Sequence, residues 1–326
     1  MRMAVTMGDA SGVGPEIVLR CYADGELAKD VVIYGDASIL IAGATLLKLK
    51  VPIRAINEPG EAIRGSLNVI DLSLLTATDL TPGELRADSG AAARAYVERA
   101  THDALEGKVA GIVTLPMNKE ATRMADPNFT GHTELIAQLC DVQNYSMMLV
   151  TDDVAVSHVS AHVPLTEAIR HVTKHRVRTV IELTHEALSM GTENPRIAVC
   201  GLNPHAGENG LFGDEEKRYI TPAIRETIDA GIDASGPYPA DTIFHQAIHR
   251  NCYDAIICMY HDQGHAPMKL FDFESAVNVT IGLPIVRTSV DHGTAFDIAW
   301  TGVAFTNSLG HALQHAWKLA LRRHSV

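Results

Sequence analysis

Histidine, which can bind a metal ion or transfer a proton, occurs 16 times among the 326 residues of this chain. Two histidines four residues apart on one helix can share a divalent metal ion. None of the pairs with this spacing belongs to an HExxH motif, and the segments that contain His171/His175 and His311/His315 are also rich in Lys and Arg, as solvated helix faces are. A metal site must therefore be assembled from separate parts of the chain. The pairs are His158/His162, His171/His175, His245/His249, His261/His265 and His311/His315.

Three histidines each follow an apolar run that predicts a buried strand: His162 in SAHVPL, His205 in GLNPHAGE and His261 in MYHDQG. Three neutral imidazoles leave coordination positions open for a substrate, which is the catalytic rather than the structural pattern. If His158 and His162 both lay in an extended strand, they would be about 13 Å apart at roughly 3.3 Å per residue, too far to chelate one ion. Spacing alone leaves the alternative of three unrelated loop histidines open.

The C-terminal stretch 260–293 combines Lys269, Asn278 and Arg287. Lysine and arginine can bind a carboxylate or a phosphate, and arginine does so with two parallel hydrogen bonds. The alternative is ordinary ion pairing with nearby acids such as Asp262 and Asp291. The residue types thus indicate an anion site or a set of ion pairs.

Two further segments resemble helix starts. In TGHTE, the free N–H groups of a first turn favour an anion, and His132 and Thr133 could donate hydrogen bonds to it. A plain helix cap is the alternative. In GDASGVGPE the glycines permit close approach of a ligand, but the motif is not GxGxxG and its acids, Asp9 and Glu16, disfavour a phosphate. A tight strand-to-helix turn explains this second segment equally well.

The elements that must position these residues alternate between short apolar runs and helical patterns. Runs such as VVIYG and AIICMY are apolar throughout, as in strands covered on both faces. Alternation of this kind predicts a mostly parallel sheet with helices on both sides and ligands beyond the carboxyl ends of the strands. The predicted strands are 3–7, 31–35, 67–72, 111–115, 147–150, 154–158, 196–201, 255–260 and 277–281. The predicted helices are 15–21, 37–47, 89–107, 133–140, 165–189, 214–230, 241–250 and 306–322.

Composition excludes several classes of protein. Hydrophobic residues make up 46% and charged residues 20%, which is typical of a globular chain. The net charge of -12 argues against a nucleic-acid-binding surface. No apolar run is long enough for a membrane helix, and the first residues enter a strand rather than a signal peptide. The five cysteines form no CxxC pair, so we expect a reduced, cytoplasmic protein.

Seven segments, taken together and in order, resemble the 4-hydroxythreonine-4-phosphate dehydrogenase family. The resemblance implies two α/β/α domains around a central cleft, similar to isocitrate and isopropylmalate dehydrogenases. We expect residues 1–130 with about 290–326 to form the first domain and about 131–289 the second, which carries most of the metal and substrate residues. The segments are GDASGVGPE, TGHTE, SAHVPL, GLNPHAGENGLFGDEE, GPYPADT, YHDQG and VNVTIGLPIVRTSVDHGTAFD.

The same resemblance implies a site shared between the subunits of a homodimer. The metal ligands are His162, His205 and His261, and the ion is Zn²⁺, or Co²⁺, Mn²⁺ or Mg²⁺. Asp241, Asp262 and Lys269 are candidates for proton transfer or for orienting other groups. The implied substrate contacts are His132, Thr133, Lys269, Asn278 and Arg287.

The implied reaction is NAD- or NADP-dependent oxidation and decarboxylation of a 4-phosphorylated 3-hydroxy acid. The segment DQGHAPMKLFDFE resembles the branch acting on D-threonate or D-erythronate 4-phosphate more than the biosynthetic branch acting on 4-hydroxythreonine-4-phosphate, which makes His265 a candidate specificity residue. The alternative is a non-redox metal hydrolase or aldolase that uses the three histidines on a phosphorylated acid.

Overall fold

The computed structural model describes the chain except residues 29, 273–274, 291 and 324–326, and it contains two compact units. Unit 1 comprises Met1–Gln143 and Leu283–Val326, and unit 2 comprises Asn144–Gly282. These bounds differ from the predicted ranges, because residues 131–143 and 283–289 belong to unit 1. The reason is packing: helix α5 (His132–Leu139) packs on helix α3 (Ala87–Leu105), and strand β12 (Arg287–Ser289) pairs with strand β5 (Gly111–Thr114).

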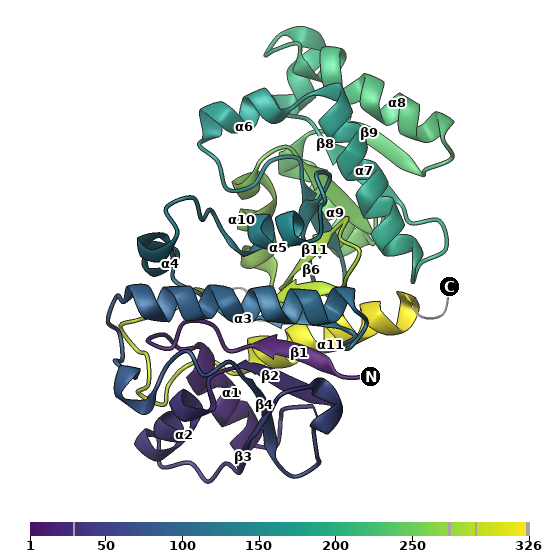
Figure 1. Ribbon diagram of the computed structural model, residues 1–326. Helices are drawn as coiled ribbons and strands as arrows, with labels where there is room; N and C mark the ends of the chain where they lie inside the picture. The colour runs from purple at the N-terminus through teal and green to yellow at the C-terminus, as the bar shows by residue number, and fades with distance from the viewer. Residues whose placement is uncertain (29, 273–274, 291, 324–326) are drawn as a thin grey trace. The chain divides into compact units, whose positions relative to one another are not determined.

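The sheet of unit 1 is parallel at each of its pairings, in the order β3-β4-β2-β1-β5-β12. Helix α3 packs on β1, β2 and β5, and α11 packs on β1, β5 and β12 (Figure 1). The remaining strands are β1 (Met3–Thr6), β2 (Val31–Gly35), β3 (Ile53–Ile56) and β4 (Leu67–Asp71). The remaining helices are α1 (Gly14–Ala23), α2 (Ala37–Leu46), α4 (Lys119–Ala125) and α11 (Asn307–Arg323), with short 3₁₀ turns η1 (Pro59–Glu61) and η2 (Ala77–Asp79).

The sheet of unit 2 has the order β11-β6-β7-β10-β8-β9. Strand β6 runs antiparallel to β11 and β7, and the other pairings are parallel. The strands are β6 (Ser146–Val150), β7 (Ala155–His158), β8 (Ile197–Cys200), β9 (Ala234–Tyr238), β10 (Ala255–Cys258) and β11 (Val277–Ile281). The helices are α6 (Leu165–His171), α7 (Lys174–Ser189), α8 (Thr221–Asp229), α9 (Ala240–Arg250) and α10 (His261–Phe271), with the turn η3 (Pro204–Gly210) and the π-helical segment η4 (Glu216–Ile220).

Alternate residues of the central strands of unit 2 enter two separate apolar cores. Val199 and Ile257 pack with residues of α7 and α8, whereas Ala198 and Ile256 pack with residues of α9 and α10. Because both faces of such a strand are buried, its sequence is apolar throughout and does not alternate between apolar and polar residues. The prediction of an α/β unit with helices on both faces of the sheet is therefore confirmed for unit 2.

Several predicted elements differ in detail. The helix expected over 165–189 is two helices, because Thr173 caps a new start by accepting a hydrogen bond from the backbone N–H of Arg176. The short strands β3, β9 and β12 and the helix α4 were not predicted. Helix α10 was also not predicted, since it contains Gly264 and Pro267, two residue types that are unfavourable inside helices. Residue His261, expected in a loop, therefore begins a helix.

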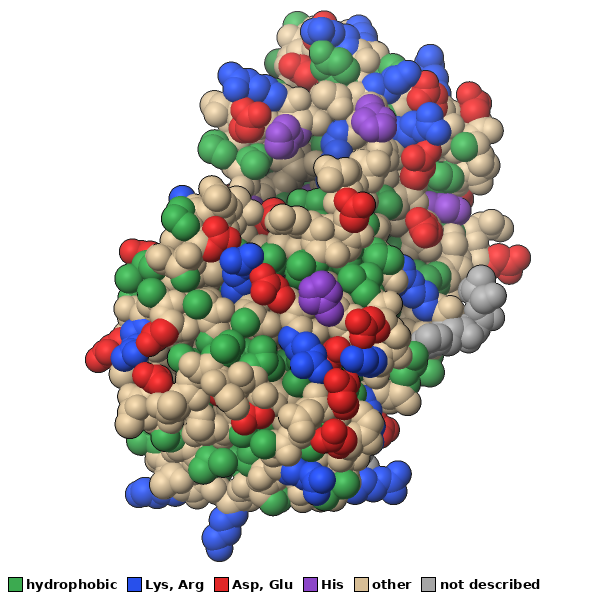
Figure 2. All heavy atoms as spheres, in the orientation of Figure 1, with side chains coloured by type: hydrophobic (Ala, Val, Ile, Leu, Met, Phe, Trp, Pro, Cys, Tyr) green, Lys and Arg blue, Asp and Glu red, His purple; other side chains and the backbone are tan. Residues whose placement is uncertain are grey.

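No helix among the described residues is long and apolar enough to cross a membrane. All five cysteines are free thiols. On the face shown in Figure 2, acidic and basic side chains are interspersed rather than gathered into a basic patch.

Candidate functional site

Four histidine rings of unit 2 lie together at the carboxyl ends of β7 and β10. His162 and His261 have ring centroids 5.5 Å apart, and His158 lies 5.9 Å from His261. His265 stacks on His261 at 3.9 Å with only 14° between the ring planes. Strand β7 ends at His158, so the extended distance expected from the sequence does not apply to His162. The structure thus brings two of the three predicted metal ligands together, and adds two histidines to them.

The protonated nitrogen of His261 can be assigned from its neighbour. The Nδ1 atom of His261 lies 2.7 Å from a carboxylate oxygen of Asp262, so Nδ1 carries the proton and donates it. In the neutral ring the lone pair then resides on Nε2. A carboxylate behind a metal-binding imidazole is a common arrangement, because it fixes the ring and raises its basicity. Asp262 therefore lies where it can orient His261, although its own side chain is largely exposed.

The other two histidines of the cluster are buried and uncharged. Burial lowers the pKa of His158 to about 4, against the opposing effect of the Met147 carbonyl. Burial also lowers the pKa of His265 to about 2, and repulsion from the neighbouring basic groups, including Lys269, acts in the same direction. Both rings are consequently neutral at pH 7. Lys269 follows His261 and His265 at intervals of four along α10, and so lies on the same face of that helix.

The third predicted ligand, His205, occupies a different environment. It starts a left-handed turn in which five consecutive residues, 205–209, have φ between 41° and 80°. The His205 ring lies 6.2 Å from that of Phe212 and lines a pocket of 340 Å³ with Glu208 and Lys217. Asp241, an exposed residue, lies in the first turn of α9, which packs against the same loop. Among the described residues of this single chain, no group of three His, Cys, Asp or Glu side chains is arranged to hold a metal ion.

Unit 1 contains a cluster of potential anion ligands around Arg287. The guanidinium is buried and lies 2.9 Å from the hydroxyl of Thr114 and 3.4 Å from that of Thr133. Burial lowers the pKa of Arg287 to about 10, although the charge of Glu134 opposes this. His132, the first residue of α5, has a buried Nε2 atom with no hydrogen-bond partner in the structure. A buried cation next to hydroxyl and imidazole groups can hold a carboxylate or a phosphate.

The remaining predicted substrate contacts, Lys269 and Asn278, belong to unit 2. Asn278 lies on β11 and its carbonyl oxygen is buried without a hydrogen-bond partner in the structure. A buried oxygen that lacks a partner within the protein can accept a hydrogen bond from a ligand. Asp291, weighed above as an ion-pair partner, lies outside the described residues. The sequence analysis did not identify Thr114, which lies beside Arg287, or His158, which lies in the histidine cluster. The only indication for His158 was its position four residues before His162.

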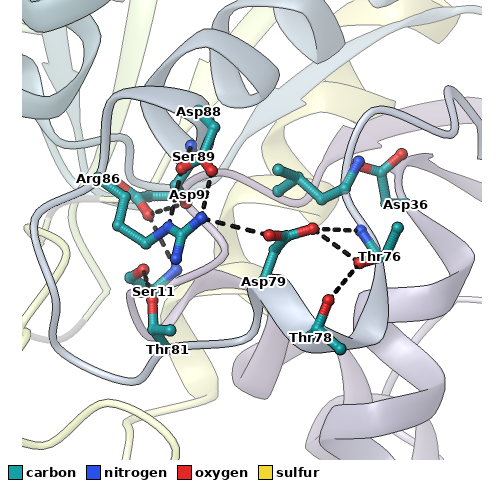
Figure 3. A network of polar contacts seen from close by, with 11 residues as sticks. Asp9, Ser11, Asp36, Thr76, Thr78, Asp79, Thr81, Arg86, Asp88 and Ser89 are labelled. Carbon is teal, nitrogen blue, oxygen red and sulfur yellow. Dashed lines mark hydrogen bonds and ion pairs between the residues drawn. The ribbon is translucent and has the colours of Figure 1, made fainter.

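The first glycine loop has a structural explanation. A Cβ atom at Gly8 would lie 2.2 Å from the Pro116 carbonyl oxygen, and one at Gly14 would lie 2.3 Å from that of Met7. The glycines therefore permit contact with the protein's own backbone. Asp9 accepts hydrogen bonds from the Ser11 N–H and the Ser89 hydroxyl in the network of Figure 3.

Replacement of Gly264 by alanine is expected to destabilise unit 2. The added methyl carbon would lie 2.5 Å from Val156 Cγ1 and 2.7 Å from His158 Nε2. Overpacking of this kind costs about 1–3 kcal/mol. Urea unfolding measures the loss, with Gly310→Ala in helix α11 as the control, because a Cβ at Gly310 would meet no atom within 4 Å and the residue is helical like Gly264. An unchanged midpoint for Gly264→Ala would contradict the close packing described here.

The lowered pKa of the partly buried His132 also predicts that stability falls in mild acid. Burial lowers the pKa of His132 to about 3, whereas its unfolded value is 6.5. Below pH 6.5 the unfolded chain binds a proton that the folded chain excludes, so the free energy of unfolding decreases as the pH falls towards the folded pKa. The slope is up to about 1.4 kcal/mol per pH unit for each such histidine. Urea unfolding at several pH values should show a smaller slope for His132→Gln and an unchanged slope for the exposed control His102→Gln.

Comparison with known proteins adds to this geometry. Residues 26–316 match the family described as "Pyridoxal phosphate biosynthetic protein PdxA". The chain is 46% identical over 323 residues to the D-threonate 4-phosphate dehydrogenase of Salmonella typhimurium, covering 98% of both chains. It is 45% identical over 320 residues to the 4-hydroxythreonine-4-phosphate dehydrogenase of Beijerinckia indica subsp. indica, covering 97% of this chain and 94% of that protein.

A solved structure gives the same result. The crystal structure of 4-hydroxythreonine-4-phosphate dehydrogenase from Klebsiella pneumoniae has a TM-score of 0.90 and 45% sequence identity, covering 98% of this chain and 99% of that one. The family match spans most of the sequence, and these relatives align over nearly their whole lengths. The chain therefore belongs to the PdxA family of pyridoxal phosphate biosynthetic proteins.

Proposed function

We propose that this protein is a dehydrogenase that oxidises and decarboxylates a 4-phosphorylated 3-hydroxy acid, using NAD or NADP and a divalent metal ion. D-Threonate or D-erythronate 4-phosphate is the favoured substrate, and 4-hydroxythreonine-4-phosphate is the alternative. The names of the relatives support a dehydrogenase acting on one of these compounds. The observation that carries the metal-dependent part is the pairing of His162 and His261, with the Asp262 carboxylate on the far nitrogen of His261.

The donor set fits a divalent ion. His162 and His261 would hold it, and His205 would complete the set from a second copy of the chain, since its ring lines a separate pocket here. Imidazole ligands suit Zn²⁺, with Co²⁺, Mn²⁺ and Mg²⁺ as alternatives. Such an ion supplies a positive charge that favours loss of the alcohol proton and then of carbon dioxide. Asp262 holds the ring of His261 throughout.

The anionic ends of the substrate would be held by the chain's own polar groups. Arg287 and Thr133 offer donors to a phosphate or carboxylate, and His132 offers its unpartnered Nε2. Lys269 and Asn278 are further proposed contacts. Oxidation moves a hydride from the carbinol carbon to the nicotinamide and releases the hydroxyl proton. The resulting β-keto acid then loses carbon dioxide.

Proton transfer is assigned to a small set of residues. Lys269 lies on the same face of α10 as His261, and Asp241 lies beside the loop that carries His205. We propose that one of these two groups moves the proton released by the alcohol, while Asp262 mainly orients His261. We also propose a cytoplasmic homodimer, to which the five free thiols and the resemblance lend support.

Nicotinamide reduction is the direct test. Purified protein is mixed with a divalent metal and NAD or NADP, and absorbance is followed with each of the three phosphorylated acids in separate reactions. We expect reduction with D-threonate or D-erythronate 4-phosphate, release of carbon dioxide, and loss of both signals on chelation. Reduction with 4-hydroxythreonine-4-phosphate alone would assign the alternative substrate. If metal-loaded protein cleaved these compounds without reducing the nicotinamide, a hydrolase or aldolase would replace the dehydrogenase.

A further inference from the structure

The proposed reaction makes no use of two buried histidines that lie beside its metal ligands. His158 and His265 are only 1% and 4% exposed, and the Nδ1 atom of His265 lies 3.1 Å from the Nε2 atom of His158. The two residues are 107 positions apart in the chain. A polar pair inside the apolar core formed by β7, β10 and α10 is costly unless its hydrogen bonds are satisfied. The pairing therefore requires an explanation beyond packing.

The hydrogen bonds determine which nitrogen of each ring carries the proton. The Nδ1 atom of His158 lies 3.3 Å from the Met147 carbonyl oxygen, which can only accept, so Nδ1 of His158 is the donor. The Nε2 atom of His158 is then an acceptor in the neutral ring. Nδ1 of His265 must accordingly be protonated and donate to it. A chain of donors thus runs from His265 through His158 to the backbone of β6.

This chain holds the plane of a third ring. His265 stacks on His261 at 3.9 Å with 14° between the planes, so the orientation of His265 limits the tilt of His261. The bond from His261 Nδ1 to Asp262 limits rotation within that plane. Gly264 makes the arrangement possible, because a Cβ there would lie 2.7 Å from the Nε2 atom of His158. Two independent constraints therefore act on the ring of His261.

We propose that His158 and His265 form a positioning pair that holds the imidazole of His261 in its metal-binding orientation. The pair acts through His261, and touches neither metal nor substrate in this proposal. The inference rests on the proposed function to the extent that His261 is a metal ligand. The competing explanation is that both rings merely fill the core, in which case an apolar residue of similar size would serve equally well.

The test uses variants that separate hydrogen bonding from volume. His158→Leu removes the acceptor for His265 and keeps most of the side-chain volume. His158→Gln instead supplies an amide oxygen that can replace the Nε2 atom of His158 as the acceptor. Ile256→Val, in the same core, is the control for lost packing. Each full-length, metal-free variant is titrated with Co²⁺, followed by its absorption spectrum and by calorimetry, and its melting temperature is recorded. Histidine ¹⁵N NMR of the unmodified protein reports the protonated nitrogen of each ring.

We expect His158→Leu to weaken Co²⁺ binding about 10- to 100-fold and to change the cobalt spectrum, as loss of a group that orients a ligand does. His158→Gln should restore affinity to within about threefold of the unmodified protein. Ile256→Val should lower the melting temperature without a change in affinity. The NMR spectrum should show Nδ1–H forms for both His158 and His265.

Other results would overturn the proposal. If His158→Leu and the unmodified protein bind Co²⁺ with equal affinity, His158 and His265 serve packing alone. The same conclusion follows if NMR finds the proton on Nε2 in both of these rings. If His158→Leu does not fold, the NMR result and the His158→Gln titration still decide. Failure of the proposed function has a different signature, namely an unmodified protein that binds Co²⁺ normally but reduces no nicotinamide with any of the three substrates.

Discussion

A heterodimer of two inactive variants, His205→Ala and His261→Ala, is expected to recover activity. His162 and His261 lie together in one unit of one chain, whereas His205 lines a separate pocket. If the metal site takes the first two ligands from one copy and the third from the other, each heterodimer retains one intact site. Its specific activity should then be about half that of the unmodified dimer, since closed twofold assemblies carry two equivalent sites.

The experiment depends on purifying the mixed species. The two variants are co-expressed with different affinity tags, and the dimer carrying both tags is isolated. Each parent homodimer is expected to lose at least about 100-fold in kcat/KM, because each lacks a ligand in both sites. Metal content per dimer, measured on the same preparations, should rise from near zero in the parents to one ion in the heterodimer.

The matched control pairs His162→Ala with His261→Ala. Both changes fall on the ligand pair that one chain supplies, so each site of this heterodimer lacks a ligand and activity should stay at the level of the parents. Recovery in the control, or no recovery in the His205→Ala and His261→Ala heterodimer, would disprove the shared site. Activity in a monomeric fraction would disprove it too.

Replacement of Arg287 by methionine is expected to weaken substrate binding strongly while leaving the fold intact. The guanidinium is buried next to Thr114 and Thr133, and burial alone lowers its pKa to about 10. Loss of a buried charged hydrogen-bonding partner costs about 2–5 kcal/mol of binding free energy, which corresponds to a decrease of about 30- to 5,000-fold in kcat/KM. The decrease should appear mainly in KM where Arg287 holds the phosphate, which does not react. A contact to the carboxylate would lower kcat as well, because that group leaves as carbon dioxide.

Although Arg287→Met weakens substrate binding, it should not lower the stability of the substrate-free protein. Desolvation of a cation destabilises the folded state, so the free energy of unfolding of Arg287→Met should equal or exceed that of the unmodified protein. Urea unfolding without and with the phosphorylated substrate measures both effects. Substrate should raise the midpoint of the unmodified protein and leave that of Arg287→Met unchanged.

Two further variants make the result specific. Arg287→Lys keeps the charge but loses the planar fork, so it should recover only part of the affinity. Arg170→Met removes an exposed arginine that pairs with Glu167 on α6, and should leave kcat/KM within about twofold. An Arg287→Met variant with a normal KM would exclude this residue from the substrate site, and a lowered unfolding midpoint would show that its role is structural.

Local sequence patterns are sufficient to predict many of the strands and helices and the residue types of the site. Apolar runs such as 31–35 and 255–258 are strands because both faces are covered, and that burial leaves a continuous signal in the chain. His162, His205 and His261 could be selected as candidates because each follows such a run. Arg287, Lys269 and Asn278 could be selected by their chemistry. These properties are local, and local sequence reports them.

Which of these residues lie together depends on long-range packing. The pairing of β12 with β5 places Arg287 beside Thr114, and the bond between His158 and His265 joins residues 107 positions apart. Helix α10 forms despite Gly264 and Pro267, because its buried face packs on β7 and β10. Long-range packing energies of this kind outweigh local propensity and leave no periodic trace in the sequence. For this reason, the sequence contained the histidines, but the fold selected the pair that lies together.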